Sequence, residues 1–202
     1  MSPAGDPASS PGGAPHAYAA LSELFDSEGG RDYLGEQVSM AQHMLQAGAA
    51  ARRAGASPEL VVAAAVHDVG HFTGVLTGRE LMQGSDNHHE EVAAGWLGRW
   101  FGPAVTEPVR LHVLAKRYLC AVDPDYEEQL SEASRYTMSV QGGPMSPEEA
   151  GAFARHPYAR EATELRRYDD LGKDPAAPAL ALADFRDDIE HLDRTVSPRR
   201  AQ

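Results

Sequence analysis

The stretch LVVAAAVHDVGHF, residues 60–72, constrains the fold more than any other part of the chain. It begins with seven consecutive apolar residues, so no side of it suits contact with water, and we expect it to be a central, buried helix. The run then ends in His67, Asp68 and His71. One interpretation is structural: His67 ends the helix and Asp68 bonds to a loop. The other is a metal site, because buried polar groups are costly unless they are paired or bind a metal.

The rest of the chain predicts helices. Ser57-Pro58, Asp123-Pro124 and Ser146-Pro147 each place a capping residue before a proline at a first helical position. No segment alternates apolar and polar residues with β-branched enrichment, so strands are not expected. We therefore predict an all-α fold. The expected helices are 18–28, 37–54, 58–69, 88–101, 106–118, 124–140, 147–155, 158–172 and 178–192.

The chain length suits one domain. With 202 residues it can bury one substantial core, and a second domain would be cramped. Residues 1–16 are mostly Pro, Gly, Ser and Ala and predict a disordered tail. We expect the folded domain at 17–195 and a frayed end at 196–202.

Charge and cysteine content exclude some classes of protein. Eighteen basic residues against 30 acidic ones give a net charge of −12, which argues against nucleic-acid binding. Cys120 is the only cysteine, so no intrachain disulfide can form. No apolar run approaches the length of a membrane span. We expect a cytoplasmic protein without membrane contact, and leave open whether it is a monomer or a dimer.

Further histidines and aspartates occur in several of the other predicted helices. Taken one at a time, each is more often structural than a ligand. Together they supply one or two candidate metal ligands from each of five predicted helices, as a dinuclear centre in a helical bundle requires. Imidazole and carboxylate ligands suit Fe, Mn and Zn. The candidates are His43, His67, Asp68, His88 or His89, His112, and Asp169 or Asp170.

This ordered pattern resembles the HD-domain superfamily, whose members hold one or two metals in an all-α bundle. Longer motifs are similar to one group within it, the phosphonate-degrading HD-domain oxygenases. They are YLGEQVSMAQHMLQ, HDVGHF, HHEEVAAGWL, EPVRLHVLAKRYLC, LSEAS, QGGPMSPEE and ELRRYDD. The resemblance covers roughly Tyr33 to Lys173.

The resemblance implies two iron ions, Fe(II) and Fe(III), with O2 as co-substrate. One iron would be held by His43, His67 and Asp169, and the other by His89 and His112. Asp68 would bridge the two. His88 and Asp170 remain alternatives to their neighbours, and His71 would be an active-site histidine outside the coordination sphere.

The resemblance also implies residues that hold an organophosphonate. Lys116 falls one helical turn after His112, so a cation is expected beside a metal ligand. Arg166, Ser134 and Thr137 would add a guanidinium and two hydroxyls, the groups that suit a phosphonate dianion. The alternative is that Lys116 and Arg166 are solvated surface residues.

Tyr33 and Glu36 match the family's mobile pair. In the family, the tyrosine occupies the second iron until substrate displaces it, and the glutamate receives the amino end of the substrate. Without the resemblance, Tyr33 is an ordinary packing residue.

The expected activity is O2-dependent cleavage of the carbon–phosphorus bond of a small 1-hydroxyphosphonate, giving phosphate and a carboxylate. The candidates are 2-amino-1-hydroxyethylphosphonate and its trimethylammonium analogue. The rival interpretation is an HD phosphohydrolase, in which the same ligands activate water to attack a small phosphate ester. A non-catalytic sensor module is a third, for which the chain lacks room for a fused effector domain.

Overall fold

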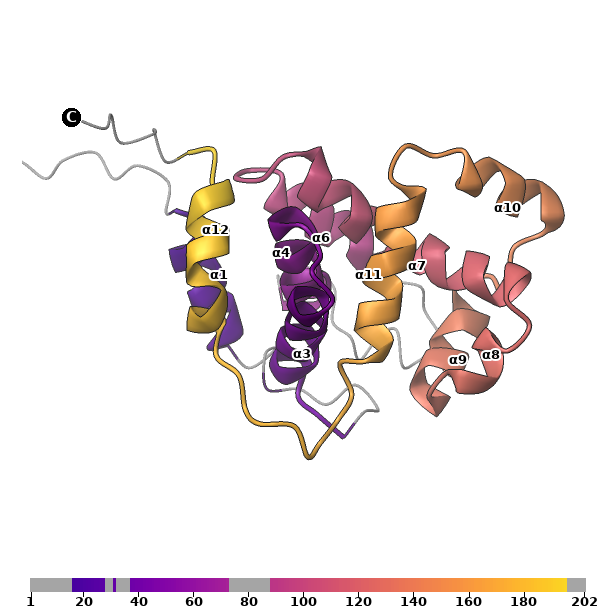
Figure 1. Ribbon diagram of the computed structural model, residues 1–202, viewed down its shortest axis with the longest axis horizontal. Helices are drawn as coiled ribbons and strands as arrows, with labels where there is room; N and C mark the ends of the chain where they lie inside the picture. Colours follow the sequence, from indigo (N-terminus) through magenta and orange to yellow (C-terminus); the bar gives the residue numbers. More distant parts are fainter. Residues whose placement is uncertain (1–15, 28–30, 32–36, 73–87, 196–202) are drawn as a thin grey trace, which may run out of the picture.

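The computed structural model describes residues 16–27, 31, 37–72 and 88–195, and these residues contain helices and no strand, which confirms the all-α prediction (Figure 1). The terminal segments predicted to be disordered or frayed lie outside the described residues, apart from His16. None of the described helices is long and apolar enough to cross a bilayer. The α-helices are α1 (Ala17–Phe25), α3 (Met40–Arg53), α4 (Pro58–Val66), α6 (His89–Leu97), α7 (Pro103–Val122), α8 (Tyr126–Gln129), α9 (Glu132–Val140), α10 (Pro147–Ala154), α11 (Ala159–Asp170) and α12 (Arg186–Leu192), with 3-10 turns η1 (Val69–Phe72) and η2 (Leu182–Phe185).

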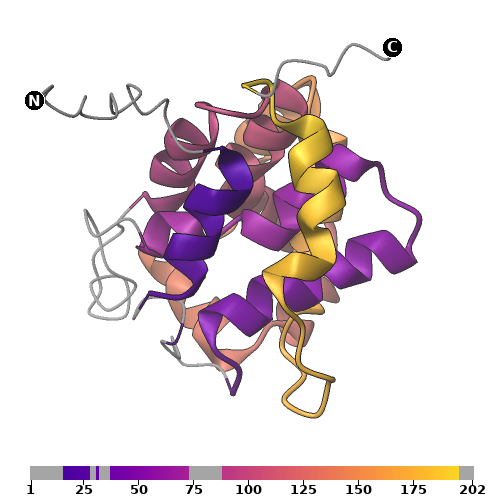
Figure 2. The same cartoon turned by 90° about the vertical axis from the view of Figure 1, so that its left-hand side faces the viewer.

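The all-apolar α4 lies at the centre, as its sequence predicts. It packs against α3, α7, α11 and α12, and its residues from Leu60 to Val66 are all buried. The main core extends from there to α1, α6 and α12, and α1 and α12 run side by side on one flank (Figure 2). Two smaller apolar clusters join α7 to α10 and α11, and α7 to α8 and α9. The bundle therefore places the polar end of α4 in its interior.

Serine caps define several helix starts. The side chain of Ser57 accepts a hydrogen bond from the backbone N–H of Leu60, and Ser146 forms a reciprocal capping box with Glu149. The predicted cap at Asp123-Pro124 is wrong, because Asp123 ends α7 and the next helix begins at Tyr126.

The predicted helix 124–140 is also wrong as a single element. Leu130 is extended and buried, and the side chain of Ser131 accepts from the N–H of Ser134 to start α9 as a separate helix. The break gives α9 its own direction. One face of this helix can then be turned toward the site described below.

Helix α7 begins three residues earlier than predicted. Gly102 is its N-cap and Pro103 its first residue, so this pair opens a helix as well as closing the segment before it. Pro108 then falls inside the helix, where it removes one backbone donor. The helix nevertheless continues to Val122 and carries buried His112 and Lys116.

Two glutamines of α3 hold the connection between α11 and α12. The amide of Gln42 bonds both the N–H and the carbonyl of Leu180, at 3.0 and 2.7 Å. Gln46 does the same for Asp174, at 3.0 and 2.9 Å. Because the backbone of Leu180 is engaged by a side chain, it is not available to a helix. The predicted helix 178–192 accordingly starts only at Leu182, through η2.

We predict opposite effects for two glycine-to-alanine substitutions. A Cβ at Gly48 of α3 would lie 2.7 Å from Ala65 Cβ and 2.8 Å from Phe185 Cε1, so Gly48→Ala should lower the free energy of unfolding by about 1–3 kcal/mol. Gly95 of α6 is exposed with no atom near its Cβ position, so Gly95→Ala should raise it by roughly 0.5–1 kcal/mol. Urea denaturation measures both. Equal effects would contradict the close contact at Gly48.

Candidate dinuclear metal centre

Five helices bring a cluster of imidazoles and carboxylates into the interior at the end of α4. The residues that converge there were all candidates from the sequence. They are His43 from α3, His67 and Asp68 at the end of α4, His71 from η1, His89 from α6, His112 from α7 and Asp169 from α11.

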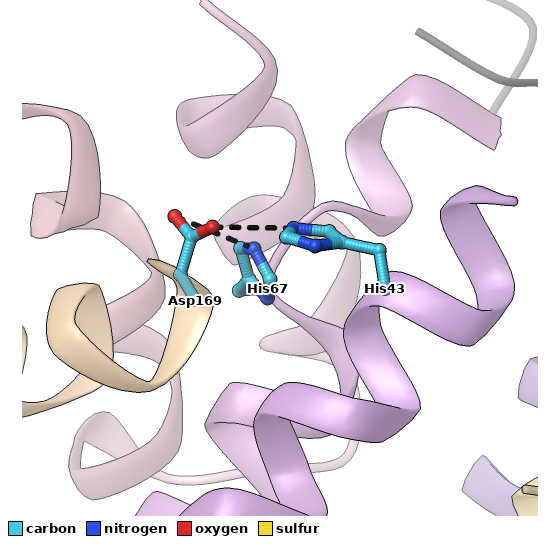
Figure 3. A group of neighbouring side chains, drawn as sticks. All are labelled: His43, His67 and Asp169. Atoms are coloured by element: carbon cyan, nitrogen blue, oxygen red, sulfur yellow. Dashed lines mark ion pairs between the residues drawn. The ribbon is translucent and has the colours of Figure 1, made fainter. Parts of the chain in front are cut away.

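One half of the cluster consists of His43, His67 and Asp169, which are buried (Figure 3). The two carboxylate oxygens of Asp169 face the imidazoles: Oδ1 lies 3.2 Å from Nε2 of His43, and Oδ2 lies 3.8 Å from Nε2 of His67. One atom from each of the three residues lies within 4.8 Å of the others. This spacing suits three ligands of a single ion.

Asp68 lies between this half and a second group of imidazoles. Its Oδ2 is 3.5 Å from Nε2 of His67 and 3.9 Å from Nε2 of His43. Its Oδ1 is 3.3 Å from Nε2 of His89 and 3.4 Å from Nε2 of His112. One carboxylate therefore turns one oxygen to each half, which is the arrangement a bridging ligand needs.

The second half holds His89, His112 and His71. Nε2 of His89 and Nε2 of His112 are 3.3 Å apart. His71 stacks on the ring of His89 with 4.1 Å between ring centroids, and it too offers a nitrogen near Asp68 and His89. Two imidazoles and one bridging oxygen thus converge here, with a third imidazole beside them.

Backbone carbonyls fix the orientation of three of these rings. Nδ1 of His43 bonds the carbonyl of Gly172 at 3.0 Å, Nδ1 of His67 that of Ala64 at 2.9 Å, and Nδ1 of His112 that of Val109 at 2.7 Å. A carbonyl only accepts, so Nδ1 carries a proton, and in the neutral ring Nε2 keeps its lone pair. This second contact is typical of metal-binding histidines.

The structure separates the two pairs of neighbouring candidates. His88 has a side chain that is 70% exposed and a positive φ of 44°, whereas the side chain of His89 is 5% exposed and faces Asp68. Asp170 bonds the hydroxyl of Tyr126 and the guanidinium of Arg166. Within the described residues, His89 and Asp169 are therefore the members of each pair that face the cluster.

Some polar atoms of the cluster are buried without a hydrogen-bond partner. Within the described residues these include Nε2 of His67 and Oδ1 of Asp68. An unpaired buried polar atom costs about 1–3 kcal/mol. A cation placed among the lone pairs would satisfy both atoms, so the donor set fits one or two metal ions.

Burial and charge set the protonation states that such a cation needs. Burial lowers the pKa of His112 and of His71 to about 3, so both rings are neutral near pH 7. Burial alone would raise the pKa of Asp169, but the charge of Arg166 holds it well below its usual range. His71 and His112 therefore offer neutral imidazoles beside an ionised carboxylate. Burial would lower the pKa of His43 and of His89, but their hydrogen bonds to Asp169 and Asp68 raise it.

A pocket opens beside the cluster and is lined by the substrate residues predicted from the sequence. Lys116, Ser134, Thr137 and Arg166 all line it, and Lys116 and Arg166 are 4% exposed, so they are not solvated surface residues. The pocket encloses about 80 Å³. This space suits a small molecule rather than a polymer.

Arg166 is largely committed to other protein groups. Its guanidinium bonds Asp169 and Asp170, and it donates to the hydroxyl of Tyr126 at 2.8 Å and to Ser134 at 3.4 Å. An arginine side chain has five N–H bonds, so at most one remains for a ligand. The main effect of Arg166 is thus to hold Asp169 in place.

Two further polar residues line the pocket and were not predicted. Nζ of Lys173 donates to Ser134 at 2.7 Å and to Ser131 at 3.2 Å, and the side chain of Gln141 accepts from Lys116. Gln141 lies seven residues after Ser134, on the same helix face, and this spacing was the available signal. Lys173 follows the end of α11, where no periodicity applies. Tyr33 and Glu36 lie outside the described residues.

Two glycines allow backbones to meet at the cluster. A Cβ at Gly70 would lie 2.1 Å from the carbonyl oxygen of His89, and one at Gly172 would lie 2.5 Å from that of His43. Gly70 does not have a positive φ. A glycine is needed there for the close approach to His89 and not for a left-handed backbone conformation.

Comparison with known proteins identifies the family. The chain is 43% identical over 150 residues to [1-hydroxy-2-(trimethylamino)ethyl]phosphonate dioxygenase (glycine-betaine-forming) of Leisingera caerulea. The matched region covers 74% of this chain and 76% of that protein. It is 38% identical over 180 residues to hydroxymethylphosphonate dioxygenase of Gimesia maris, covering 85% of both chains. The chain belongs to the HD-domain phosphonate dioxygenases.

An uncharacterised protein of Acanthamoeba polyphaga mimivirus is a further relative of this phosphonate dioxygenase, 35% identical over 153 residues, or 74% of this chain and 69% of that protein. No family model matches the chain. The family predicted from the motifs is confirmed, and the pocket and the two half-sites agree with it.

Proposed function

We propose that this chain uses O2 to cleave the carbon–phosphorus bond of a small 1-hydroxyphosphonate, with phosphate and a carboxylate as products. The candidates are 2-amino-1-hydroxyethylphosphonate and its trimethylammonium analogue. The observation that carries the proposal is Asp68, whose two oxygens face two separate groups of imidazoles beside a cationic pocket. Two of the relatives named above, those of Leisingera caerulea and Gimesia maris, are dioxygenases of such phosphonates.

The proposed metal is a pair of iron ions, Fe(II) and Fe(III). His43, His67 and Asp169 would hold one ion, His89 and His112 the other, and Asp68 would bridge them. When bound, such a pair supplies Lewis acidity toward substrate oxygens and the redox chemistry that O2 requires. The four electrons that reduce O2 come from the substrate, so no nicotinamide or flavin is needed.

The protein residues would bind and orient the substrate. Lys116, Lys173 and Arg166 place positive charge around the pocket, which explains how a chain of net charge −12 can bind an anion locally. Ser134 and Thr137 present hydroxyls from α9. His71, neutral near pH 7, is placed beside the second half-site. From the family resemblance, we propose that Glu36 would receive the amino end of the substrate and that Tyr33 would be the residue that the substrate displaces from the second iron.

We expect oxygen uptake coupled to phosphate release. The protein is loaded anaerobically with Fe(II) and then given O2 with 2-amino-1-hydroxyethylphosphonate, its trimethylammonium analogue or hydroxymethylphosphonate. One O2 should be consumed per phosphate released, because both reflect the same C–P cleavage. Phosphate released from a phosphate ester without O2 uptake would instead establish the hydrolase.

Asp68→Ala should reduce iron binding and activity together, because both half-sites lose an oxygen ligand. Metal analysis after iron loading should give at most one ion per chain, with activity below about 1% of wild type. Asp187→Ala, an exposed aspartate of α12, is the matched control and should change neither. A fully loaded and active Asp68→Ala protein would exclude the bridging role.

Phosphonate binding should weaken above neutral pH. Burial, and then the charge of Arg166, lower the pKa of Lys116 to about 7, so the ammonium is charged below pH 7 and is lost as the pH rises. Arginine stays protonated throughout. The affinity of Lys116→Arg relative to wild type should therefore increase from pH 6.5 to 9, roughly tenfold or more. The phosphonate ionises identically in the measurements on the two proteins. A ratio of the two affinities that stays constant with pH would therefore contradict the role of Lys116 in phosphonate binding.

A further inference from the structure

Gln141 lies at the end of α9 and contacts the buried cation of the pocket. It is the C-cap residue of that helix, its side chain lines the pocket, and it is 7% exposed. Its Oε1 accepts a hydrogen bond of 2.6 Å from Nζ of Lys116. Since an ammonium only donates, the oxygen of the amide and not its nitrogen must face Lys116.

Thr137 supplies the second acceptor for the same ammonium. Nζ of Lys116 donates to Oγ1 of Thr137 at 3.0 Å, while that hydroxyl donates its own proton to the carbonyl of Ser134 at 3.2 Å. Two of the three N–H bonds of Lys116 are thus directed to α9. Within the described residues the third N–H bond has no acceptor, so it can donate to a ligand that enters the pocket.

Both acceptors are uncharged, and this matters for binding an anion. A carboxylate in the place of Gln141 would neutralise the ammonium and repel a dianion. A neutral amide oxygen fixes the position of the nitrogen and leaves its charge for the ligand. Gln141 is also the first residue of the QGGPM motif, which contains none of the proposed metal ligands or substrate-binding hydroxyls.

We propose that Gln141 is a positioning residue that aims the ammonium of Lys116 at the anionic group of the substrate while leaving that charge uncompensated. The inference rests on the proposed use of Lys116 for phosphonate binding. It predicts that Gln141 controls affinity, through KM, with little direct effect on turnover.

Gln141→Met and Gln141→Glu test this role in different ways. Methionine has a similar shape but is a poor acceptor, so Lys116 loses its tightest contact. Glutamate keeps an acceptor but adds a negative charge. Gln129→Met and Gln129→Glu are matched controls, because Gln129 is exposed at the end of α8 and does not line the pocket.

The binding probe is methylphosphonate, which carries the anionic group but no 1-hydroxyl. Calorimetry on the anaerobic iron-loaded protein should show Kd raised about tenfold in Gln141→Met and about 100-fold in Gln141→Glu. The KM for the trimethylammonium substrate should rise in parallel, with kcat within roughly threefold and iron content unchanged. The Gln129 variants should match wild type.

Unchanged Kd in both Gln141 variants would overturn the inference. So would a fall in kcat and iron content at constant Kd, because that pattern indicates a purely structural role. If the wild-type protein itself neither binds methylphosphonate nor releases phosphate with O2, the proposed function fails first. If the wild-type protein binds methylphosphonate and both Gln141 variants bind it equally well, the proposed function stands and only the positioning role of Gln141 is excluded.

Discussion

A buried imidazole nitrogen without a hydrogen-bond partner in the described part of the chain sets the conditions for the rest of the structure. Nε2 of His67 lies in the interior of the bundle and faces Asp68 and Asp169 across 3.5 and 3.8 Å. Water does not reach it, and its Nδ1 is already bonded to Ala64. A cation shared with the two carboxylates is the partner whose chemistry fits, and the surrounding helices bring the other ligand atoms to the same point.

Helix α3 determines much of that convergence. Three of its side chains reach the backbone of the segment after α11: Gln42 at Leu180, His43 at Gly172 and Gln46 at Asp174. The same ring of His43 turns its other nitrogen to Asp169. Helix α3 thus fixes its own candidate ligand, His43, together with the segment that follows Asp169 of α11. The same helix therefore holds both the connection after α11 and the first half-site in place.

The sequence allowed the helices, the family and the inward candidates to be predicted, since helical periodicity, serine caps and ordered His/Asp motifs are local signals. Contacts between distant residues were not predictable in this way. Leu180 was predicted to be helical, but the side-chain amide of Gln42, 138 residues away in the sequence, forms the hydrogen bonds of its backbone. Arg166 looked like a substrate fork, but Tyr126 and Asp170 occupy most of its donors. Ser131 carried a cap signal without the proline that marked Ser57 and Ser146, and the break before α9 was missed.

The glycines at 70 and 172 have a consequence for protein engineering. Neither has a side chain that could bind a metal. Gly70 lies against the backbone of His89 and Gly172 against that of His43, and neither position has space for a methyl group. Exchanging an imidazole for a carboxylate alters which ion is preferred. Adding a single carbon at Gly70 would push η1 away from α6, and adding one at Gly172 would push the chain after α11 away from α3. In redesign for another metal, the ligand positions are the variables, and these two residues belong to the fixed frame.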